Sequence, residues 1–384
     1  MDYFSSDFKL GILGGGQLGK MLLYETRKFD IYTLVMDASP EAPCKIACNE
    51  FFLGDLMDYE AVYNFGKKVN VLTIEIENVN VDALEKLETE GITVYPASKT
   101  LRTIQNKAQQ KLFYVDHEIP TADFSRFAYK SEIEDSIENG GLDLPFVWKA
   151  AQFGYDGQGV KVVRSLQDLD GLPSGECIAE EMVPFKNELA VIVVRNPNGQ
   201  VVTYPVVEME FHPEANQVEY VICPARIDDK VAAKAQEIAL KVSEKIKHIG
   251  ILAVELFQTQ DDEILVNEVA PRPHNSGHYS IEASYTNQFE QHIRAILNLP
   301  LGNTESKVAG IMVNLVGAEG YSGNVVYENL EEILKLDGVT PHIYGKRQTR
   351  PFRKMGHVTI VNPDIEEARK IAGVVKNTIK VISR

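Results

Sequence analysis

Two glutamates, Glu255 and Glu268, stand on a predicted β-hairpin and could together hold a divalent cation. Apolar strands are predicted over residues 251–257 and 263–269, with a polar turn at Asp261-Asp262 between them. A two-residue turn would place Glu255 directly opposite Glu268, with Cβ atoms roughly 5 Å apart. Like charges so close are destabilising unless a cation lies between them or one carboxyl keeps its proton. The pair suits Mg²⁺, which takes one or two carboxylates and adds water and phosphate oxygens.

Polar side chains crowd the segment around the end of this hairpin. Asn267 offers a further neutral oxygen, although strict alternation along a strand points it to the opposite face. A plain surface hairpin followed by a polar loop is the alternative interpretation. The loop is opened by two prolines, and its polar members are Arg272, His274, Asn275, Ser276 and His278.

A glycine-rich turn near the amino terminus predicts an anion site. The apolar strand Lys9–Leu13 runs into residues 14–19, GGGQLG, which match G-x-G-x-x-G, and a helical pattern follows. Asp37 lies 18 residues beyond Gly19, where a dinucleotide-binding fold places its ribose ligand. The motif therefore allows an NAD enzyme. It equally allows a phosphate or carboxylate seat made by backbone N–H groups, or a tight turn without a ligand.

Three more features could handle anions. A second glycine-rich segment, residues 154–159, lies between predicted strands directly after Lys149, which describes a flap able to approach phosphates. Lys107 and Lys111 fall one turn apart on a helix predicted from Ser98 to about residue 115, a pattern that is usually only solvated. Basic residues also gather in the segment 339–361, which is either a solvated loop or an anion seat.

Composition narrows the class of protein. A chain of 384 residues with 44% hydrophobic and 24% charged residues is expected to form two or three ordinary globular domains. The net charge of −16 argues against a nucleic-acid partner. The four cysteines include no C-x-x-C pair, and neither a signal-peptide core nor an 18-residue apolar run occurs. We therefore expect a cytoplasmic protein that neither binds nor crosses a membrane.

The segments described so far resemble the ATP-grasp superfamily. The resemblance rests on Lys149 with the flap GYDGQG, on Glu255 before Asn267-Glu268, and on the loop APRPHNSGH. Within the superfamily, the segments ILGGGQLGKML, TIEIENV and RPFRKMGH are similar to the N5-carboxyaminoimidazole ribonucleotide synthetase family of purine biosynthesis over essentially the whole chain. One position departs from the pattern, because Phe352 stands where family members often have glycine.

This resemblance implies an α/β architecture, α+β in its ATP-grasp part, with three domains. Residues 1–100 would form a doubly wound, Rossmann-like pre-ATP-grasp domain that seats the substrate phosphate. Residues 101–187 would form a small central lid domain. Residues 188–384 would form the larger C-terminal domain with the metal site and the basic tail.

The resemblance also implies roles for individual residues. Glu255 and Glu268 would hold Mg²⁺, Lys149 and Arg272 would offset oxygen charge, and Asp156 would accept the proton of the substrate amine. The residues implied to bind ATP are Lys107, Lys149, Gly154, Tyr155, Asp156, Gly157, Gln158, Gly159, Glu180, Glu181, Met182, Val183, Glu188, His212, Asn267 and Glu268. The residues expected around the acceptor are Gly15, Gly16, Gln17, Leu18, Ser39, Glu77, Tyr155, Asp156, Arg272, His274, Asn275, Lys346 and Arg353.

The implied reaction is the ATP-dependent carboxylation of 5-aminoimidazole ribonucleotide by bicarbonate through carboxyphosphate, with Mg²⁺ as the metal and a homodimer as the assembly. Other ATP-grasp ligases, such as formate-dependent ribonucleotide transformylases or biotin carboxylases, are near alternatives that differ in the acceptor. An NAD-dependent oxidoreductase would leave the flap, the paired glutamates and the basic tail unexplained. A non-catalytic nucleotide-binding module is disfavoured by the carboxylate pair.

Overall fold

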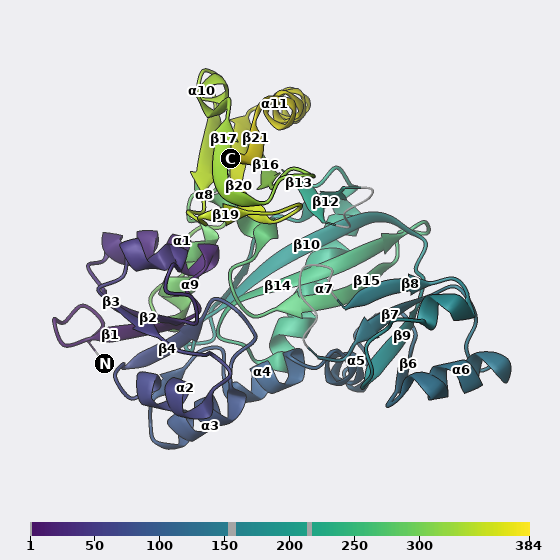
Figure 1. The fold of residues 1–384 in the computed structure, drawn as a ribbon. Helices are drawn as coiled ribbons and strands as arrows, with labels where there is room; N and C mark the ends of the chain where they lie inside the picture. Colours follow the sequence, from purple (N-terminus) through teal and green to yellow (C-terminus); the bar gives the residue numbers. More distant parts are fainter. Residues whose placement is uncertain (1, 153–158, 213–216) are drawn as a thin grey trace.

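The computed structural model describes residues 2–152, 159–212 and 217–384, and its ribbon divides into units built on separate sheets (Figure 1). A parallel sheet forms at the amino-terminal end and a small antiparallel sheet follows it in the chain. A large antiparallel sheet then runs through the centre of the molecule, and a short three-stranded sheet lies beside its far end. A parallel, doubly wound amino-terminal sheet followed by antiparallel sheets is the mixed α/β architecture that was expected.

The amino-terminal sheet is parallel with strand order β3-β2-β1-β4-β5. The order reverses between β1 and β4, so the segments that follow these two strands meet at the carboxyl edge, where doubly wound sheets bind ligands. Gly14 leaves β1 with a φ of +97°, which glycine adopts without steric cost. The elements are β1 (Lys9–Leu13), α1 (Gln17–Lys28), β2 (Tyr32–Asp37), η1 (Pro43–Ile46), β3 (Glu50–Leu53), α2 (Tyr59–Gly66), β4 (Val71–Ile74), α3 (Val81–Thr89) and β5 (Thr93–Val94).

Two helices, not the single predicted one, connect this sheet to the next unit. They are α4 (Ser98–Ile104) and α5 (Lys107–Asp116). The chain breaks because the Asn106 side chain caps α5 by accepting the amide N–H of Gln109 at 3.0 Å. Ser98 is not the cap of α4, since its hydroxyl donates to Glu88 at 2.5 Å. The break redirects α5 so that the Lys107 amide donates to the Ala151 carbonyl of the small sheet at 2.7 Å.

The small sheet has the order β6-β9-β7-β8 and lies on the right in Figure 1. Its hydrophobic core is made by side chains such as Phe146, Trp148 and Val163 and is closed by one helix. The elements are β6 (Phe124–Phe127), α6 (Lys130–Glu138), β7 (Phe146–Ala150), β8 (Val160–Val163), η2 (Leu166–Leu169) and β9 (Cys177–Glu181).

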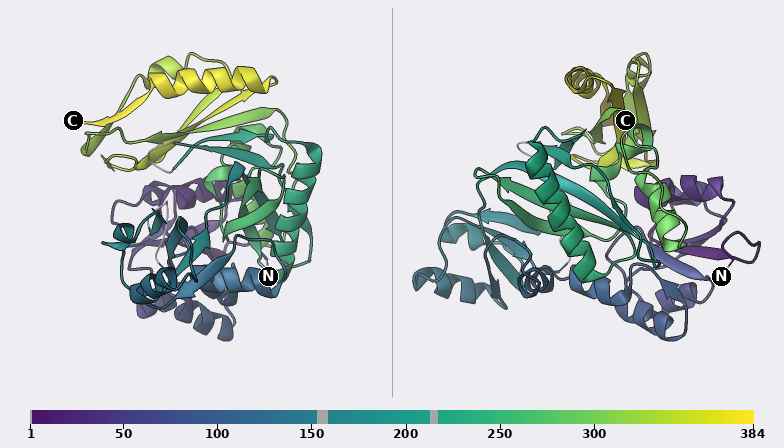
Figure 2. Two further views of the ribbon diagram at one scale, coloured as in Figure 1. Left: turned by 90° about the vertical axis from the view of Figure 1, so that its right-hand side faces the viewer. Right: turned by 180° about the vertical axis from the view of Figure 1, so that it is seen from behind.

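The large sheet follows the order β15-β14-β10-β12-β13-β16-β20-β18, and β11 pairs with β10. Helix α7 crosses one face of the sheet, as Figure 2 shows from behind. Its buried residues Val231, Ala235, Ile238 and Val242 recur every three or four positions, the spacing of an apolar helix face. The elements are β10 (Phe185–Arg195), β11 (Val201–Thr203), β12 (Val207–Phe211), β13 (Val218–Cys223), α7 (Asp229–Ile246), β14 (Gly250–Thr259), β15 (Ile264–Ala270), η3 (Asn275–Gly277), α8 (Ser280–Ala283), α9 (Gln288–Ile296) and β16 (Ala309–Val316).

The carboxyl-terminal part covers the far end of the large sheet, where α11 packs on β16 and β20 (Figure 2). The basic segment 339–361 contains strands β18, β19 and most of β20, whereas Lys346, Arg347, Arg350 and Arg353 lie in the connections between them; His357, on β20, is fully buried. The elements are β17 (Gly323–Glu328), α10 (Leu330–Ile333), β18 (Val339–Ile343), β19 (Gln348–Thr349), β20 (Lys354–Asn362), α11 (Ile365–Thr378) and β21 (Lys380–Ser383).

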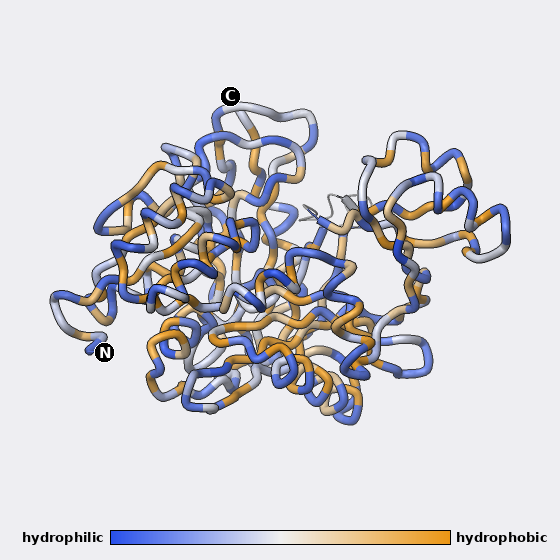
Figure 3. Tube along the Cα trace, turned by 90° about the horizontal axis from the view of Figure 1, so that it is seen from below, coloured by the Kyte–Doolittle hydropathy of each residue, from blue (hydrophilic) through white to orange (hydrophobic). Residues whose placement is uncertain are grey.

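Hydrophobic residues fill the interior of each unit, and the colouring in Figure 3 shows hydrophilic residues at many of the outer turns. One cluster crosses a boundary between units: Phe289 and Ile293 of α9 and Tyr344 pack with Leu18 and Leu22 of α1. The amino-terminal domain is therefore joined to the large sheet through a shared core. Among the described residues, no helix combines the length and the apolar composition needed to cross a bilayer.

Candidate active site

The hairpin β14–β15 places Glu255 opposite Glu268, as expected, but by a different route. The turn has three residues, because Thr259 pairs with Glu263, and Asp262 takes a left-handed φ of +61°. That turn alone would shift the register by one residue. A bulge at Asn267 restores it, since Leu256 pairs with Val266 while Glu255 pairs with Glu268. Strict alternation along the strand would point Asn267 to the opposite face. The bulge interrupts that alternation, and the Asn267 amide oxygen accepts a hydrogen bond from Lys149 at 2.9 Å.

Three lysines converge on these carboxylates and on Glu180. Lys107 forms an ion pair with Glu268. Lys149, on β7, lies 2.8 Å from one carboxylate oxygen of Glu180, and Lys111 lies 3.2 Å from the other. The expectation that Lys107 and Lys111 are merely solvated is wrong, because Lys111 is only 2% exposed and also donates to Thr121 at 2.6 Å. The break before α5 turns this lysine face toward the sheets.

The protonation states follow from burial and from neighbouring charges. Burial, together with the negative charge of Glu268, raises the pKa of Glu255 to about 8. Lys107 holds the pKa of Glu268 well below its usual range. Burial lowers the pKa of Lys111 to about 8 against the opposing influence of Glu180. The Glu255–Glu268 pair therefore keeps one proton, on Glu255. A divalent cation bound by both carboxylates could replace that proton.

The carboxylates of Glu255 and Glu268 fit Mg²⁺ when its other oxygen ligands come from outside the protein. No group of three or more His, Cys, Asp or Glu with metal-ligand geometry occurs among the residues the structure describes. Mg²⁺ does not require one, since it is commonly held by one or two carboxylates plus phosphate oxygens and water. Lys107 compensates the charge of Glu268, whereas the raised pKa of Glu255 reflects burial and the negative charge of Glu268. These residues therefore fit a metal site in which nucleotide phosphates supply some of the oxygen ligands better than a site in which the protein supplies all of them.

The loop after β15 brings three predicted residues next to this pair. The His274 Nε2 atom lies 3.3 Å from a Glu255 oxygen, and its Nδ1 atom accepts the amide N–H of Ser276, so the ring proton faces Glu255. Arg272 pairs with Glu77 at 2.8 Å and thereby connects the loop to the end of β4. Asn275 is buried and exchanges hydrogen bonds with Asn314 on β16. These contacts fix the loop between the amino-terminal domain and the large sheet.

At the glycine-rich turn, several backbone N–H groups already donate hydrogen bonds to carboxylates of the protein. Asp37 accepts from Gly15 at 2.7 Å, while Glu75 accepts from Gly16 at 3.1 Å and from Gly19 at 3.0 Å. Asp37 thus stabilises the turn instead of standing ready for a ribose, which removes the main support for an NAD enzyme. Among the residues that the structure describes, the amides of Gln17 and Leu18, at the start of α1, are the donors of this turn that remain for an anion.

The other expected acceptor residues considered are Ser39, which follows β2 of the parallel sheet, and Lys346 and Arg353 of the basic tail. Ser39 is exposed and bonds to Asp37 through its amide. Lys346 donates to the Lys354 carbonyl at 2.7 Å and Arg353 to the Gln348 carbonyl at 2.6 Å, so both side chains are held by backbone oxygens of the basic tail.

The expected nucleotide residues lie at the end of β9 and on the facing strands of the large sheet. Glu181 ends β9 and Met182 is exposed, while the Val183 carbonyl accepts the amide of Phe185. Burial raises the pKa of Glu188, on β10, to about 7. The His212 ring lies edge-on to Phe352, at 6.0 Å between centroids. Of the flap, only Gly159 is described; Gly154, Tyr155, Asp156, Gly157 and Gln158 lie outside the described residues.

Sequence reasoning missed two buried charges. Glu75, directly after β4, accepts hydrogen bonds from two amides of the glycine-rich turn. Lys111 follows Lys107 by one helical turn, so the pattern already put both on one face, but only tertiary packing against Glu180 and Thr121 shows that the face is buried.

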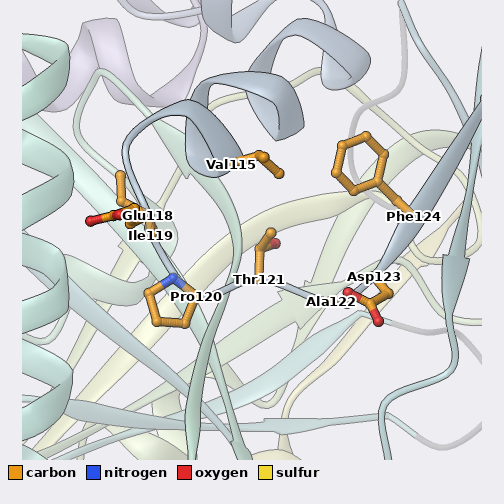
Figure 4. Close-up of a pocket in the computed structure, with 8 residues that line it drawn as sticks. All are labelled: Val115, Glu118, Ile119, Pro120, Thr121, Ala122, Asp123 and Phe124. Atoms are coloured by element: carbon orange, nitrogen blue, oxygen red, sulfur yellow. The ribbon is translucent and has the colours of Figure 1, made fainter.

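A surface hollow of about 310 Å³ lies behind this cluster, at the connection of α5 to β6 (Figure 4). Its lining is largely apolar, from Val115, Ile119, Pro120 and Phe124, and it contains none of the three lysines. Thr121 belongs to both places, since it lines the hollow and contacts Lys111. The hollow is therefore not the anion site.

Comparison with known proteins matches successive parts of the chain to three families. The ribonucleotide synthetase preATP-grasp domain matches residues 8–105, the ATP-grasp domain residues 112–289, and the phosphoribosylaminoimidazole carboxylase C-terminal domain residues 310–371.

Whole relatives agree with the family matches. The chain is 37% identical to N5-carboxyaminoimidazole ribonucleotide synthase of Bacillus subtilis, over 93% of this chain and 92% of that protein. It is 38% identical to the chloroplastic phosphoribosylaminoimidazole carboxylase of Vigna aconitifolia, of whose length it spans only 64%.

Solved structures share the architecture. The N5-carboxyaminoimidazole ribonucleotide synthetase of Thermotoga maritima superimposes with a TM-score of 0.90 at 43% identity, over 98% of this chain and 100% of that one. The Aspergillus clavatus enzyme, solved with ADP and 5-aminoimidazole ribonucleotide, superimposes with a TM-score of 0.88 at 33% identity, over 97% and 98% of the two chains.

Proposed function

Because the chain belongs to the N5-carboxyaminoimidazole ribonucleotide synthetase family of ATP-grasp enzymes, we propose that it carboxylates 5-aminoimidazole ribonucleotide with bicarbonate at the expense of ATP, in the synthesis of purine nucleotides. The observation that carries the proposal is the Glu255–Glu268 pair beside Lys107 and Lys149, between the small and the large sheet. The products are N5-carboxyaminoimidazole ribonucleotide, ADP and phosphate.

Lys107 and Lys149 bind the nucleotide phosphates in this proposal. Both ammonium groups stand beside Glu268-Asn267, where the oxygens of entering phosphates can accept charge-assisted hydrogen bonds from them. Glu188 accepts the ribose hydroxyls, and residues 180–183 with His212 border the base. Glu255 and Glu268 hold Mg²⁺, which when bound would neutralise charge on the phosphate oxygens during transfer.

The acceptor binds across the carboxyl edge of the parallel sheet. Its phosphate meets the amides of Gln17 and Leu18, with Lys346 and Arg353 supplying positive charge. Arg272, His274 and Asn275 surround the amine, and Ser39 and Glu77 the ribose. Support comes from the Arg272–Glu77 pair, which brings the two groups of residues together.

Activation of bicarbonate explains why ATP and an amine acceptor share one site. Bicarbonate alone would have to expel hydroxide, whereas the γ-phosphoryl group converts it to carboxyphosphate, which expels phosphate. Positioned cations stabilise the charge that develops in such a transfer, and Lys149 and Arg272 fill that role. Water must be excluded because it would hydrolyse the intermediate.

The decisive experiment measures ADP release from ATP and Mg²⁺ with bicarbonate and 5-aminoimidazole ribonucleotide, each present or omitted. Stimulation that needs both co-substrates supports the proposal. Stimulation by formate with a ribonucleotide, or by biotin with bicarbonate, would assign the chain to another ATP-grasp reaction. Binding of NADH with no binding of ATP–Mg²⁺, followed through the fluorescence of Trp148 next to Lys149, would overturn the ligase altogether.

Asp156 is the proposed acceptor of the amine proton, from its place in the flap sequence. Replacement Asp156→Asn keeps the size of the side chain and removes the base. We expect turnover to fall at least about 100-fold while ATP binding persists. Full turnover in Asp156→Asn would show that another group takes the proton.

The assembly and the compartment are also proposals. We propose a homodimer in the cytoplasm. All four cysteines are free thiols, which suits a reducing compartment. Sedimentation equilibrium at micromolar concentration tests the dimer, and a species of 42.9 kDa alone would exclude it.

A further inference from the structure

Lys20 is a buried lysine that the function described so far does not use. It belongs to α1, directly after the glycine-rich segment 14–19, and is only 8% exposed. Its ammonium group donates to the carbonyls of Ile343 at 3.1 Å and Tyr344 at 3.3 Å, in a segment more than 300 positions away in the chain. Burying an ammonium group is costly unless it fixes something the fold needs.

The segment that Lys20 holds is the connection from β18 to β19. Gly345 follows with a φ of +85°, and a Cβ atom there would come within 3.3 Å of the Lys20 nitrogen. Lys346 comes next, one of the cations proposed to bind the ribonucleotide phosphate. Lys20 thus ties the cation-bearing connection to the helix whose first amides face the same phosphate.

The ring of Tyr344 contacts the ammonium group of Lys346. The Lys346 nitrogen lies 5.7 Å from the centroid of the Tyr344 ring, within cation–π range. The ring is 2% exposed and packs in the core cluster that contains Leu18. Its hydroxyl shares a 3.1 Å hydrogen bond with Nδ1 of His357. Tyr344 therefore touches helix α1, the cation and the large sheet at once.

His357 gives Tyr344 a rigid anchor. Its ring stacks on His342 at 4.5 Å and lies 4.7 Å from His278, between centroids. His278 is fixed in turn by Gln288 at 2.9 Å, which also bonds both backbone groups of His274. The hydroxyl of Tyr344 thus joins the phosphate side of the site to the loop beside Glu255.

From these contacts we infer that Lys20 and Tyr344 are positioning residues for the ribonucleotide phosphate: they fix the connection that carries Lys346 to helix α1, and their loss weakens binding of the ribonucleotide but not of ATP. The inference rests on the proposed function. Lys20 acts through the backbone of residues 343–345, and Tyr344 acts through its ring and hydroxyl.

The test compares five variants with the wild-type enzyme. Lys20→Met and Tyr344→Phe remove the inferred contacts, and Lys20→Arg keeps the charge. Lys28→Met takes an exposed lysine from the same helix. Tyr327→Phe removes another hydroxyl bonded to β20, at the Met355 carbonyl. KM is measured for the ribonucleotide and for ATP from ADP release, ribonucleotide binding by calorimetry without ATP, and the melting temperature for each variant.

We expect the KM for the ribonucleotide to rise about tenfold in Lys20→Met and about threefold in Tyr344→Phe, with the KM for ATP within twofold of wild type. Lys20→Arg recovers most of the loss, and Lys28→Met and Tyr327→Phe match the wild type. Unchanged ribonucleotide KM and calorimetric affinity in both variants would overturn the inference, as would equal rises in both KM values. A wild-type enzyme that neither binds nor responds to the ribonucleotide would instead overturn the proposed function.

Discussion

At the scale of single residues, the site is organised around charges that are only partly compensated. Glu268 has Lys107 as a partner, whereas Glu255 faces Glu268, a histidine ring and a buried environment. Glu180, in contrast, is compensated twice, by Lys111 and Lys149. An entering cation and nucleotide would complete the charge balance, which is the electrostatic preparation that a phosphoryl transfer needs.

Replacement Glu268→Gln tests the proposed metal carboxylate. We expect ADP release to fall at least about 100-fold, or about 2.7 kcal/mol of transition-state stabilisation, because one metal oxygen and the partner of Lys107 are lost together. The control is Glu263→Gln on the same hairpin, an exposed carboxylate paired with Lys234. Native turnover in Glu268→Gln, with native-like melting, would refute the metal assignment.

Glu188 predicts a pH dependence of ATP binding. Burial raises its pKa to about 7, so the carboxyl is largely protonated at pH 6 and ionised at pH 8. If the carboxylate accepts ribose hydroxyls, the KM for ATP should be about tenfold higher at pH 6 than at pH 8. Glu188→Gln should flatten that profile. The same slope in wild type and Glu188→Gln would mean that another group titrates.

At the scale of elements, the hairpin β14–β15 shows two local irregularities that cancel. The three-residue turn shifts the pairing by one, and the bulge at Asn267 shifts it back before the glutamates. A regular hairpin with this turn would place Asn267 opposite Glu255 and turn Glu268 to the other face. The bulge therefore places Glu268 opposite Glu255, and it also brings Asn267 within hydrogen-bond distance of Lys149.

Phe352, between β19 and β20, gives a prediction about backbone strain. Its φ is +61°, a left-handed conformation that costs a residue other than glycine about 1–2 kcal/mol. Glycine, which the resemblance leads one to expect here, would relieve it. We expect Phe352→Gly to be more stable than Phe352→Ala by about 1 kcal/mol, measured by urea unfolding, because both lose the ring and only alanine keeps the strain. Equal stabilities would show that the surrounding turn relaxes.

At the scale of the whole molecule, a buried histidine links the amino-terminal domain to the large sheet. His292, on α9, accepts the amide N–H of Ile251 on β14 at Nδ1, at 3.2 Å. Its Nε2 atom therefore carries the proton and lies 2.9 Å from the hydroxyl of Thr73 on β4. The neutral ring satisfies both neighbours, and the contact joins three elements from two units.

Acid should weaken this link. Burial lowers the pKa of His292 to about 3, below the value of about 6.5 in an unfolded chain. Between these values the unfolded state binds more protons, so the contribution is complete above pH 6.5 and is lost as the pH falls toward 3.

Replacement His292→Gln keeps a donor and an acceptor but cannot titrate. We expect the wild type to lose about 2 kcal/mol more stability than His292→Gln between pH 7 and pH 5, measured by urea unfolding at each pH. His117→Gln, which removes a partly exposed histidine at the C-terminal cap of α5, serves as the control. A wild type and a His292→Gln variant with parallel pH profiles would contradict this account.

The sequence by itself determined what local patterns encode. Strand periodicity and glycine placement predicted β1, the glycine-rich turn, the hairpin and the pairing of Glu255 with Glu268. The motifs of the ATP-grasp resemblance predicted the architecture and the family. These features are readable because each depends on neighbours in the chain, or on a spacing that chemistry requires.

Only the tertiary structure decided which charges are buried and what each contacts. Lys111 and Glu75 have ordinary local sequences, yet tertiary packing buries both beside partners more than 50 positions away: Glu75 within the amino-terminal domain and Lys111 against the small sheet. The turn and the bulge of the hairpin have compensating effects on register, so periodicity alone could not detect either. Lys20 meets Tyr344 across 324 positions, a contact that depends on how two domains pack and that no local pattern records.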